Sequence, residues 1–138
     1  KHPGAVCMIP RLPDNRIALI RQYRYPVKRE MIELPAGKLE EDEKPEVCAA
    51  RELEEEIGYR SEKLTLLTHI HPAVGFADEV MGLYMAENLV KTACNQDEDE
   101  FLELMPTPLD EAVKMVWNGK ITDVKSIIGI LWAERLLS

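Results

Sequence analysis

Short apolar runs separated by turn-forming residues dominate the first two-thirds of the chain. Such runs predict β-strands when they alternate in polarity or are bounded by proline, glycine, asparagine or aspartate. The predicted strands cover residues 5–9, 16–25, 30–34, 64–70, 80–86 and 101–105. We expect the third strand to break at residues 35–37, where Pro, Ala and Gly follow one another.

Three further segments have helical periodicity. Residues 45–57 begin with a proline, which suits the first helical position, and Gly58 follows as a terminator. Residues 109–117 and 124–137 have amphipathic spacing. At about 100° per residue, the first helix should turn four apolar residues toward the core: Val47, Ala50, Leu53 and Ile57.

The order of these elements predicts an α/β fold. Strands with one inserted helix, followed by two terminal helices, are typical of a mixed sheet covered by helices. The length fits one domain over residues 1–138.

Composition narrows the classes of function. The chain has 17 Lys and Arg against 25 Asp and Glu, a formal net charge of −8, which argues against a nucleic-acid partner because such proteins present a basic surface. No apolar run approaches the ~18 residues that a membrane span needs, so no membrane association is expected. The three cysteines, Cys7, Cys48 and Cys94, form no C-x-x-C pair and are expected to be reduced thiols, which indicates a cytoplasmic protein.

Three glutamates crowd the predicted first helix. On the helical wheel Glu52, Glu55 and Glu56 fall opposite the apolar face, within one turn. Like charges at this spacing cost a few tenths of a kcal/mol per pair, so something must offset them. Water, salt and nearby cationic side chains are one answer. A hard divalent cation is the other, because Mg²⁺ prefers carboxylate oxygens and keeps positions open for substrate phosphates.

The wider pattern around these glutamates is more specific than their charge. Residues 37–59, here called the carboxylate box, read G-x5-E-x7-R-E-L-x-E-E-x-G and then Tyr59. This pattern resembles the signature of the Nudix hydrolases, with Tyr59 where the family has a bulky aliphatic residue. Seven positions match: Gly37, Glu43, Arg51, Glu52, Glu55, Glu56 and Gly58. The resemblance implies an α/β/α sandwich around a mixed sheet and hydrolysis of a diphosphate linked to another moiety.

The resemblance also implies a ligand set. Glu52, Glu55 and Glu56 would be metal ligands together with the backbone carbonyl of Ala36, and the metal would be Mg²⁺ or Mn²⁺. Glu55 would also serve catalysis. Glu43 and Arg51 would form a pair that braces the loop against the helix.

Two flanking segments are similar to the branch that hydrolyses ADP-ribose and other nucleoside diphosphate sugars. The first contains residues 21–26 and 33–37, in which Arg21 and Arg24 would bind the substrate, with Arg24 at the diphosphate or a terminal ribose. The second is the loop of residues 71–79, from which Gly75, Phe76 and Glu79 would contact the substrate. In this branch that loop also lies near a dimer contact, so a homodimer is expected.

An acidic stretch at residues 95–100 follows the predicted strands. One interpretation is a solvent-exposed loop with no role in catalysis. In the branch that this chain resembles, however, such a loop supplies the catalytic base and a further metal ligand. Glu98 and Glu100 would fill these roles, in either order. Members of the branch usually have further strands before the position of Lys1, so either such strands precede this segment or the chain is a minimal member.

The resemblance therefore implies metal-dependent cleavage of ADP-ribose or a related nucleoside diphosphate sugar to a nucleoside monophosphate and a sugar phosphate. Two alternatives stay open. One is a Nudix hydrolase that acts on nucleoside triphosphates or dinucleoside polyphosphates. The other is a non-catalytic Nudix domain that binds a nucleotide, although such domains typically lack carboxylates that this chain retains.

Overall fold

Seven strands and three α-helices make up the part of the chain that the structure, a computed structural model, describes: residues 4–92 and 102–137. The strands are β1 (Ala5–Pro10), β2 (Ile17–Arg24), β3 (Arg29–Glu33), β4 (Ala36–Lys38), β5 (Tyr59–Ile70), β6 (Met81–Lys91) and β7 (Leu102–Thr107). The helices are α1 (Pro45–Ile57), α2 (Leu109–Trp117) and α3 (Val124–Leu137), with a short 3-10 turn, η1 (Tyr25–Val27), between β2 and β3.

The strands form two sheets that meet where β1 leads into β2. One has the order β4-β1-β6-β5, in which β1 runs parallel to β6 and the other neighbours are antiparallel. The other is antiparallel throughout, with the order β3-β2-β7. A bridge between Arg11 and Ile17 joins the two at the turn. The predicted mixed sheet is thus present as the four-stranded sheet.

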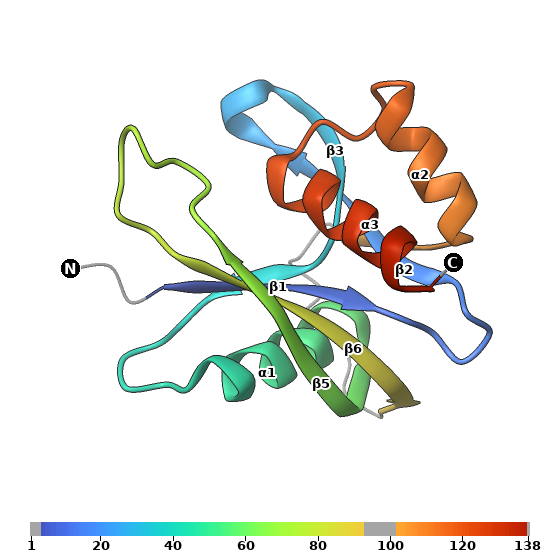
Figure 1. The fold of residues 1–138 in the computed structure, drawn as a ribbon, viewed down its shortest axis with the longest axis horizontal. Helices are drawn as coiled ribbons and strands as arrows, with labels where there is room; N and C mark the ends of the chain where they lie inside the picture. The colour runs from blue at the N-terminus through green and yellow to red at the C-terminus, as the bar shows by residue number, and fades with distance from the viewer. Residues whose placement is uncertain (1–3, 93–101, 138) are drawn as a thin grey trace.

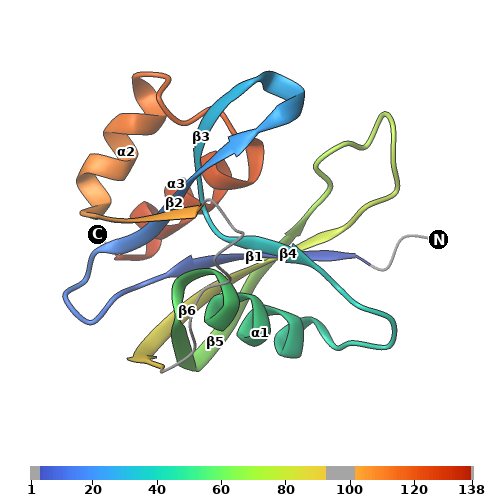
Figure 2. The same ribbon diagram turned by 180° about the vertical axis from the view of Figure 1, so that it is seen from behind.

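Helices cover both sides of these sheets, as Figures 1 and 2 show. Successive strand residues point to opposite faces, and β1 follows this rule while being buried on both. Cys7 and Ile9 join the core beneath α2 and α3, whereas Val6 and Met8 join the core against α1. The expected α/β/α sandwich is confirmed.

Helix α1 has the predicted bounds but a rotated buried face. Pro45 begins the helix, and Gly58 ends it in the left-handed conformation with φ of 73°. Its buried residues are Cys48, Ala49, Leu53 and Ile57. The prediction that Val47 faces the core is wrong, because Val47 is 55% exposed. The helix packs against β1, β4 and β5, so the side that faces the sheet is set by those strands and not by apolar spacing alone.

The strands also differ from the sequence pattern in extent. Residues 36–38 form β4 instead of a break, because this segment pairs antiparallel with β1 and Met8 donates its N–H to the Pro35 carbonyl at 2.9 Å. Strands β5 and β6 are longer than predicted because they pair with each other along almost their whole lengths. Within the described residues, no helix is long and apolar enough to cross a bilayer.

Candidate active site

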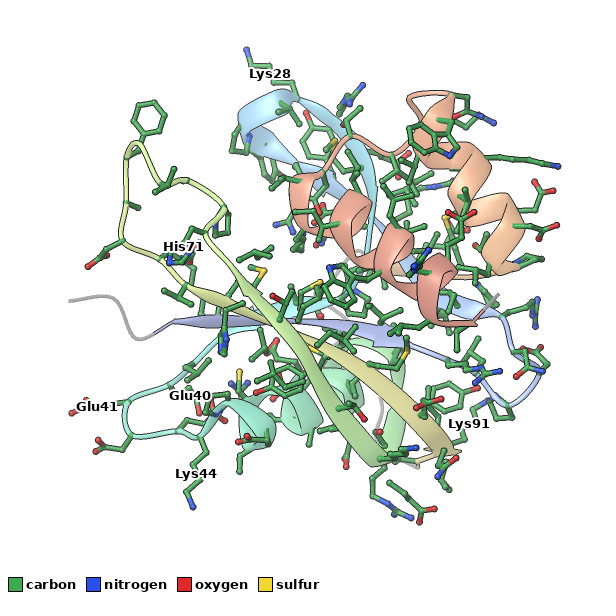
Figure 3. The ribbon with its side chains drawn as sticks, in the orientation of Figure 1. Lys28, Glu40, Glu41, Lys44, His71 and Lys91 are labelled. Carbon is green, nitrogen blue, oxygen red and sulfur yellow. The ribbon has the colours of Figure 1, made fainter. Side chains whose placement is uncertain are left out.

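The loop between β4 and α1 is tied to the helix by one arginine. Arg51 donates from Nε to Glu43 Oε2 and from Nη2 to Glu43 Oε1, both at 2.9 Å. The same Glu43 carboxylate accepts the Glu40 backbone N–H at 2.9 Å. These contacts hold the loop against α1. Figure 3 labels Glu40, Glu41 and Lys44 on this loop.

This pairing strongly favours the charged forms of both groups. The bidentate hydrogen bond from Arg51 and the backbone bond from Glu40 lower the pKa of Glu43 from 4.5 to about 2. The Glu43 hydrogen bond and the Glu52 charge raise the pKa of Arg51 further above its ordinary value. Arg51 also contacts Glu52 Oε1 at 3.0 Å and Glu55 Oε2 at 3.4 Å.

The three clustered glutamates do not share one solvent-facing side, contrary to the wheel. The Glu52 side chain is only 14% exposed, whereas that of Glu55 is 51% exposed. Glu56 Oε1 accepts the backbone N–H of Ala36 at 3.1 Å. Glu52 and Glu56 are therefore turned toward β4, because α1 lies against this strand.

Gly37 permits this close approach. A Cβ atom at position 37 would lie 2.2 Å from both Cδ and Oε2 of Glu52, which real side chains do not tolerate. The Glu52 carboxylate therefore occupies space that any other residue at position 37 would fill. This places two carboxylates, Glu52 and Glu56, beside the β4 backbone.

Oxygen donors of this kind suit a hard divalent cation. Within residues 4–92 and 102–137, no group of three or more His, Cys, Asp or Glu side chains is arranged as a complete metal site. Glu98 and Glu100 lie outside the described residues. The two carboxylates and the Ala36 backbone form the part of the predicted ligand set that the structure brings together, with Glu55 further out on the helix.

A cavity of about 340 Å³ adjoins this part of the site. Its walls come from the end of β2, β4, the 71–80 loop and the start of α3. In Figure 3 His71 marks the beginning of that loop and Lys28 the tip of the β2–β3 hairpin. Polar and backbone groups of the wall include Arg24, Ala36, Gly37, Glu79, Asp123 and Lys125.

The predicted substrate-binding residues divide into two groups. Arg24 and Glu79 line the cavity. Arg21, Gly75 and Phe76 do not: Arg21 pairs with Glu103 at 3.5 Å, and Phe76 is 97% exposed in the 71–80 loop.

The wall also contains a charged network that the sequence prediction missed. Glu33, which is 2% exposed, accepts hydrogen bonds from Arg24 Nε and Nη2 at 2.7 and 2.8 Å, and from Lys125 Nζ at 2.7 Å. Burial by itself would raise the pKa of Glu33, but these two cations hold it below its usual value. A lysine in the first turn of a mostly apolar helix, two residues after Asp123, is the sequence signal that could have indicated it.

The fold and the site together define an α/β/α-sandwich protein with a glutamate-bearing helix packed on the strand before it. The chain belongs to the NUDIX family, since the NUDIX domain profile matches residues 1–126. The family that the carboxylate box predicts is thus confirmed.

Two relatives and one solved structure are similar to this chain. It is 41% identical over 136 residues to the ADP-ribose pyrophosphatase of Bacillus subtilis (strain 168), covering 97% of this chain and 74% of that protein. It is 43% identical over 136 residues to the methanol dehydrogenase activator of Bacillus methanolicus, again with 97% and 74% coverage. A crystal structure of an ADP compounds hydrolase has a TM-score of 0.87 at 23% identity, covering 97% of this chain and 72% of that one, and it supports the fold.

The Glu43–Arg51 pair predicts a pH effect on stability. Because the pKa of Glu43 falls from 4.5 to about 2 on folding, its carboxylate stabilises the folded state above pH 4.5 and loses this effect as the pH falls toward 2. Glu43→Gln should therefore be less stable at pH 7 and lose less stability between pH 4.5 and 2. Urea unfolding at a series of pH values measures both.

The exposed Glu41 supplies a matched control, since its side chain points away from the loop in Figure 3. Glu41→Gln should keep the wild-type dependence on pH. Identical slopes for wild type and Glu43→Gln would contradict the assigned role of the pair.

Proposed function

We propose that this protein hydrolyses the diphosphate bond of ADP-ribose or a related nucleoside diphosphate sugar. Water adds across the P–O–P bridge, and the products are a nucleoside monophosphate and a sugar phosphate. The observation that carries the proposal is the position of the box carboxylates, Glu52 and Glu56, beside β4 at the edge of a cavity. Similarity to an ADP-ribose pyrophosphatase over almost the whole chain supports the substrate class.

The cavity wall suits the polar part of such a substrate. Arg24 supplies a donor for phosphate oxygens, and the carboxylates of Glu79 and Asp123 can accept from sugar hydroxyls. Arg21, Gly75 and Phe76 lie outside the cavity wall, and we assign them to parts of the substrate that extend beyond it.

Nudix hydrolases generally depend on a divalent metal ion, and we propose Mg²⁺, with Mn²⁺ as a substitute. Glu52, Glu55, Glu56 and the Ala36 carbonyl would hold it, together with Glu100. When bound, such an ion neutralises phosphate charge and lowers the pKa of a coordinated water. We propose that a loop glutamate, Glu98 or Glu100, acts as the general base that accepts the proton of the attacking water.

A substrate panel tests the activity. We expect the purified protein to release AMP from ADP-ribose with Mg²⁺ and to lose this activity in EDTA. GDP-mannose, UDP-glucose, a diadenosine polyphosphate and dGTP complete the panel. Faster cleavage of dGTP or of the diadenosine compound would contradict the proposed substrate class, and no cleavage of any member would favour a binding domain.

The approach of α1 to β4 predicts the effect of a minimal change. Gly37→Ala should displace the Glu52 carboxylate, because the new Cβ would lie 2.2 Å from its Cδ. The displaced atoms are the end of a flexible side chain, so the free energy of unfolding should change by less than about 1 kcal/mol. We expect kcat/KM for ADP-ribose to fall on the order of 100-fold, as when one charge-stabilising group is lost.

Two substitutions on α1 serve as a comparison and a control for Gly37→Ala. Glu56→Gln should lower kcat to a similar extent, because it removes the second carboxylate beside β4. Glu54→Gln makes the same chemical change two residues earlier, outside the proposed ligand set, and should leave turnover near wild type. Normal turnover in Gly37→Ala or Glu56→Gln would refute the proposed metal ligands.

We also propose that the protein is a homodimer. Support comes from the 71–80 loop, where Val74 is 81% and Phe76 is 97% exposed, since exposed apolar groups often mark an interface. Light scattering of the protein at micromolar concentration should give twice the chain mass of 15.7 kDa. A monomer mass would contradict the proposal.

We also propose that the protein is cytoplasmic. Cys7 and Cys48 are buried and unpaired, and burial raises the pKa of each thiol to about 12. Neutral, unpaired thiols are typical of a reducing compartment. The third cysteine, Cys94, lies outside the described residues.

A further inference from the structure

Residues 33–36 precede the carboxylate box and are here called the pre-box segment. The first turn of α3 contacts this segment directly. The Leu34 backbone N–H donates to Ser126 Oγ at 2.8 Å, and Ser126 Oγ donates to Asp123 Oδ2 at 2.5 Å. One turn later the helix comes so close that a Cβ on Gly129 would lie 2.4 Å from Leu34 Cδ1. The pre-box segment is therefore docked on α3 by a hydrogen bond and by direct packing.

Lys125 adds a charged contact to the same docking. It is 8% exposed, and its Nζ lies 2.7 Å from Glu33 Oε1 and 2.7 Å from Asp123 Oδ2. An ammonium group has three donors, and these two carboxylates take two of them. Removing one partner from a buried ion pair leaves the other charge without compensation, so the geometry of Glu33 depends on Lys125.

Glu33 in turn orients Arg24. The carboxylate receives Nε and Nη2 of Arg24 in a two-point contact, which fixes the plane of the guanidinium. Within the described residues Nη1 of Arg24 has no hydrogen-bond partner, while the Arg24 side chain is 45% exposed and lines the cavity. The orientation of this donor is thus determined by a chain of contacts that begins on α3.

We propose that Lys125 is a positioning residue for substrate binding: through Glu33 it holds the Arg24 guanidinium in the cavity wall, where Nη1 can bind an anionic oxygen of the substrate. The proposal rests on the proposed function, since the anion is the diphosphate of the nucleotide sugar.

Steady-state kinetics with ADP-ribose and Mg²⁺ test the role in binding. Lys125→Met replaces the apolar part of the side chain as far as Cε and removes the charged amino group. We expect KM to rise about tenfold and kcat to change less than about threefold, because Arg24 loses its orientation while the box carboxylates remain in place. Lys125→Arg retains a cation that can reach both carboxylates and should recover most of the lost affinity.

Lys114 on α2 provides the matched control. Its side chain is 69% exposed and pairs with Glu111 on the same helix at 3.4 Å. Lys114→Met should leave KM at the wild-type value. If Lys125→Met raises KM no more than Lys114→Met does, or if it lowers kcat with KM unchanged, the positioning role is refuted.

A second readout does not require activity. The Arg24 Nε–H is held by Glu33 at 2.7 Å and should give a resolved arginine side-chain signal in ¹H–¹⁵N NMR, assigned by its loss in Arg24→Lys. Lys125→Met should shift or broaden it, whereas the Arg51 Nε–H, bound to Glu43, should stay in place. An unchanged Arg24 signal would refute the proposal.

The two readouts separate this proposal from the proposed function. If the wild type cleaves no nucleotide sugar, the proposed function fails, and the NMR comparison still decides whether Lys125 positions Arg24. Circular dichroism verifies folding of each variant. If Lys125→Met does not fold, Lys125→Gln, which keeps a donor without the charge, is judged by the same criteria.

Discussion

Glu33 is only 2% exposed, and a carboxylate buried to that extent is stable only where cations and hydrogen bonds replace its water. Two cations from different elements do so. Arg24 reaches it from the end of β2, and Lys125 reaches it from α3, 92 residues further along the chain. The ion pairs of the Glu33 carboxylate therefore connect the β2–β3 hairpin, the pre-box segment and α3 beside the cavity.

The pre-box segment and β4 are held from two sides. On one side α3 contacts Leu34 through Ser126 and Gly129. On the other side α1 approaches so closely that Glu56 accepts the Ala36 N–H and Glu52 fills the space beside Gly37. Because protein interiors are close-packed and transmit small displacements, the position of this short stretch sets how the helix carboxylates lie relative to the cavity. The site is built around a backbone segment and not around a single side chain.

Charge explains how an acidic chain can receive an anionic substrate. Three cations beside the site are already matched by carboxylates: Arg51 pairs with Glu43, Arg24 with Glu33, and Lys125 with Glu33 and Asp123. These pairs fix geometry more than they supply net positive charge. The carboxylates of Glu52, Glu55 and Glu56 on α1 suit a divalent cation, in agreement with the general metal dependence of the family. Such an ion would provide the positive charge that a protein with a net charge of −8 otherwise lacks.

Local pattern in the sequence by itself determined the three helices and their bounds, the existence of most strands, the family and the residues of the carboxylate box. Helix periodicity, Pro45 and Gly58 act within a few residues, so they can be read along the chain. Tertiary structure alone decided which side of α1 is buried, that residues 36–38 pair with β1, and that Glu52 and Glu56 face β4 while Glu55 does not. It also joined Glu33 to Lys125. These outcomes depend on contacts between segments far apart in the sequence, where the burial of a charge and the close approach of two backbones leave no periodic trace.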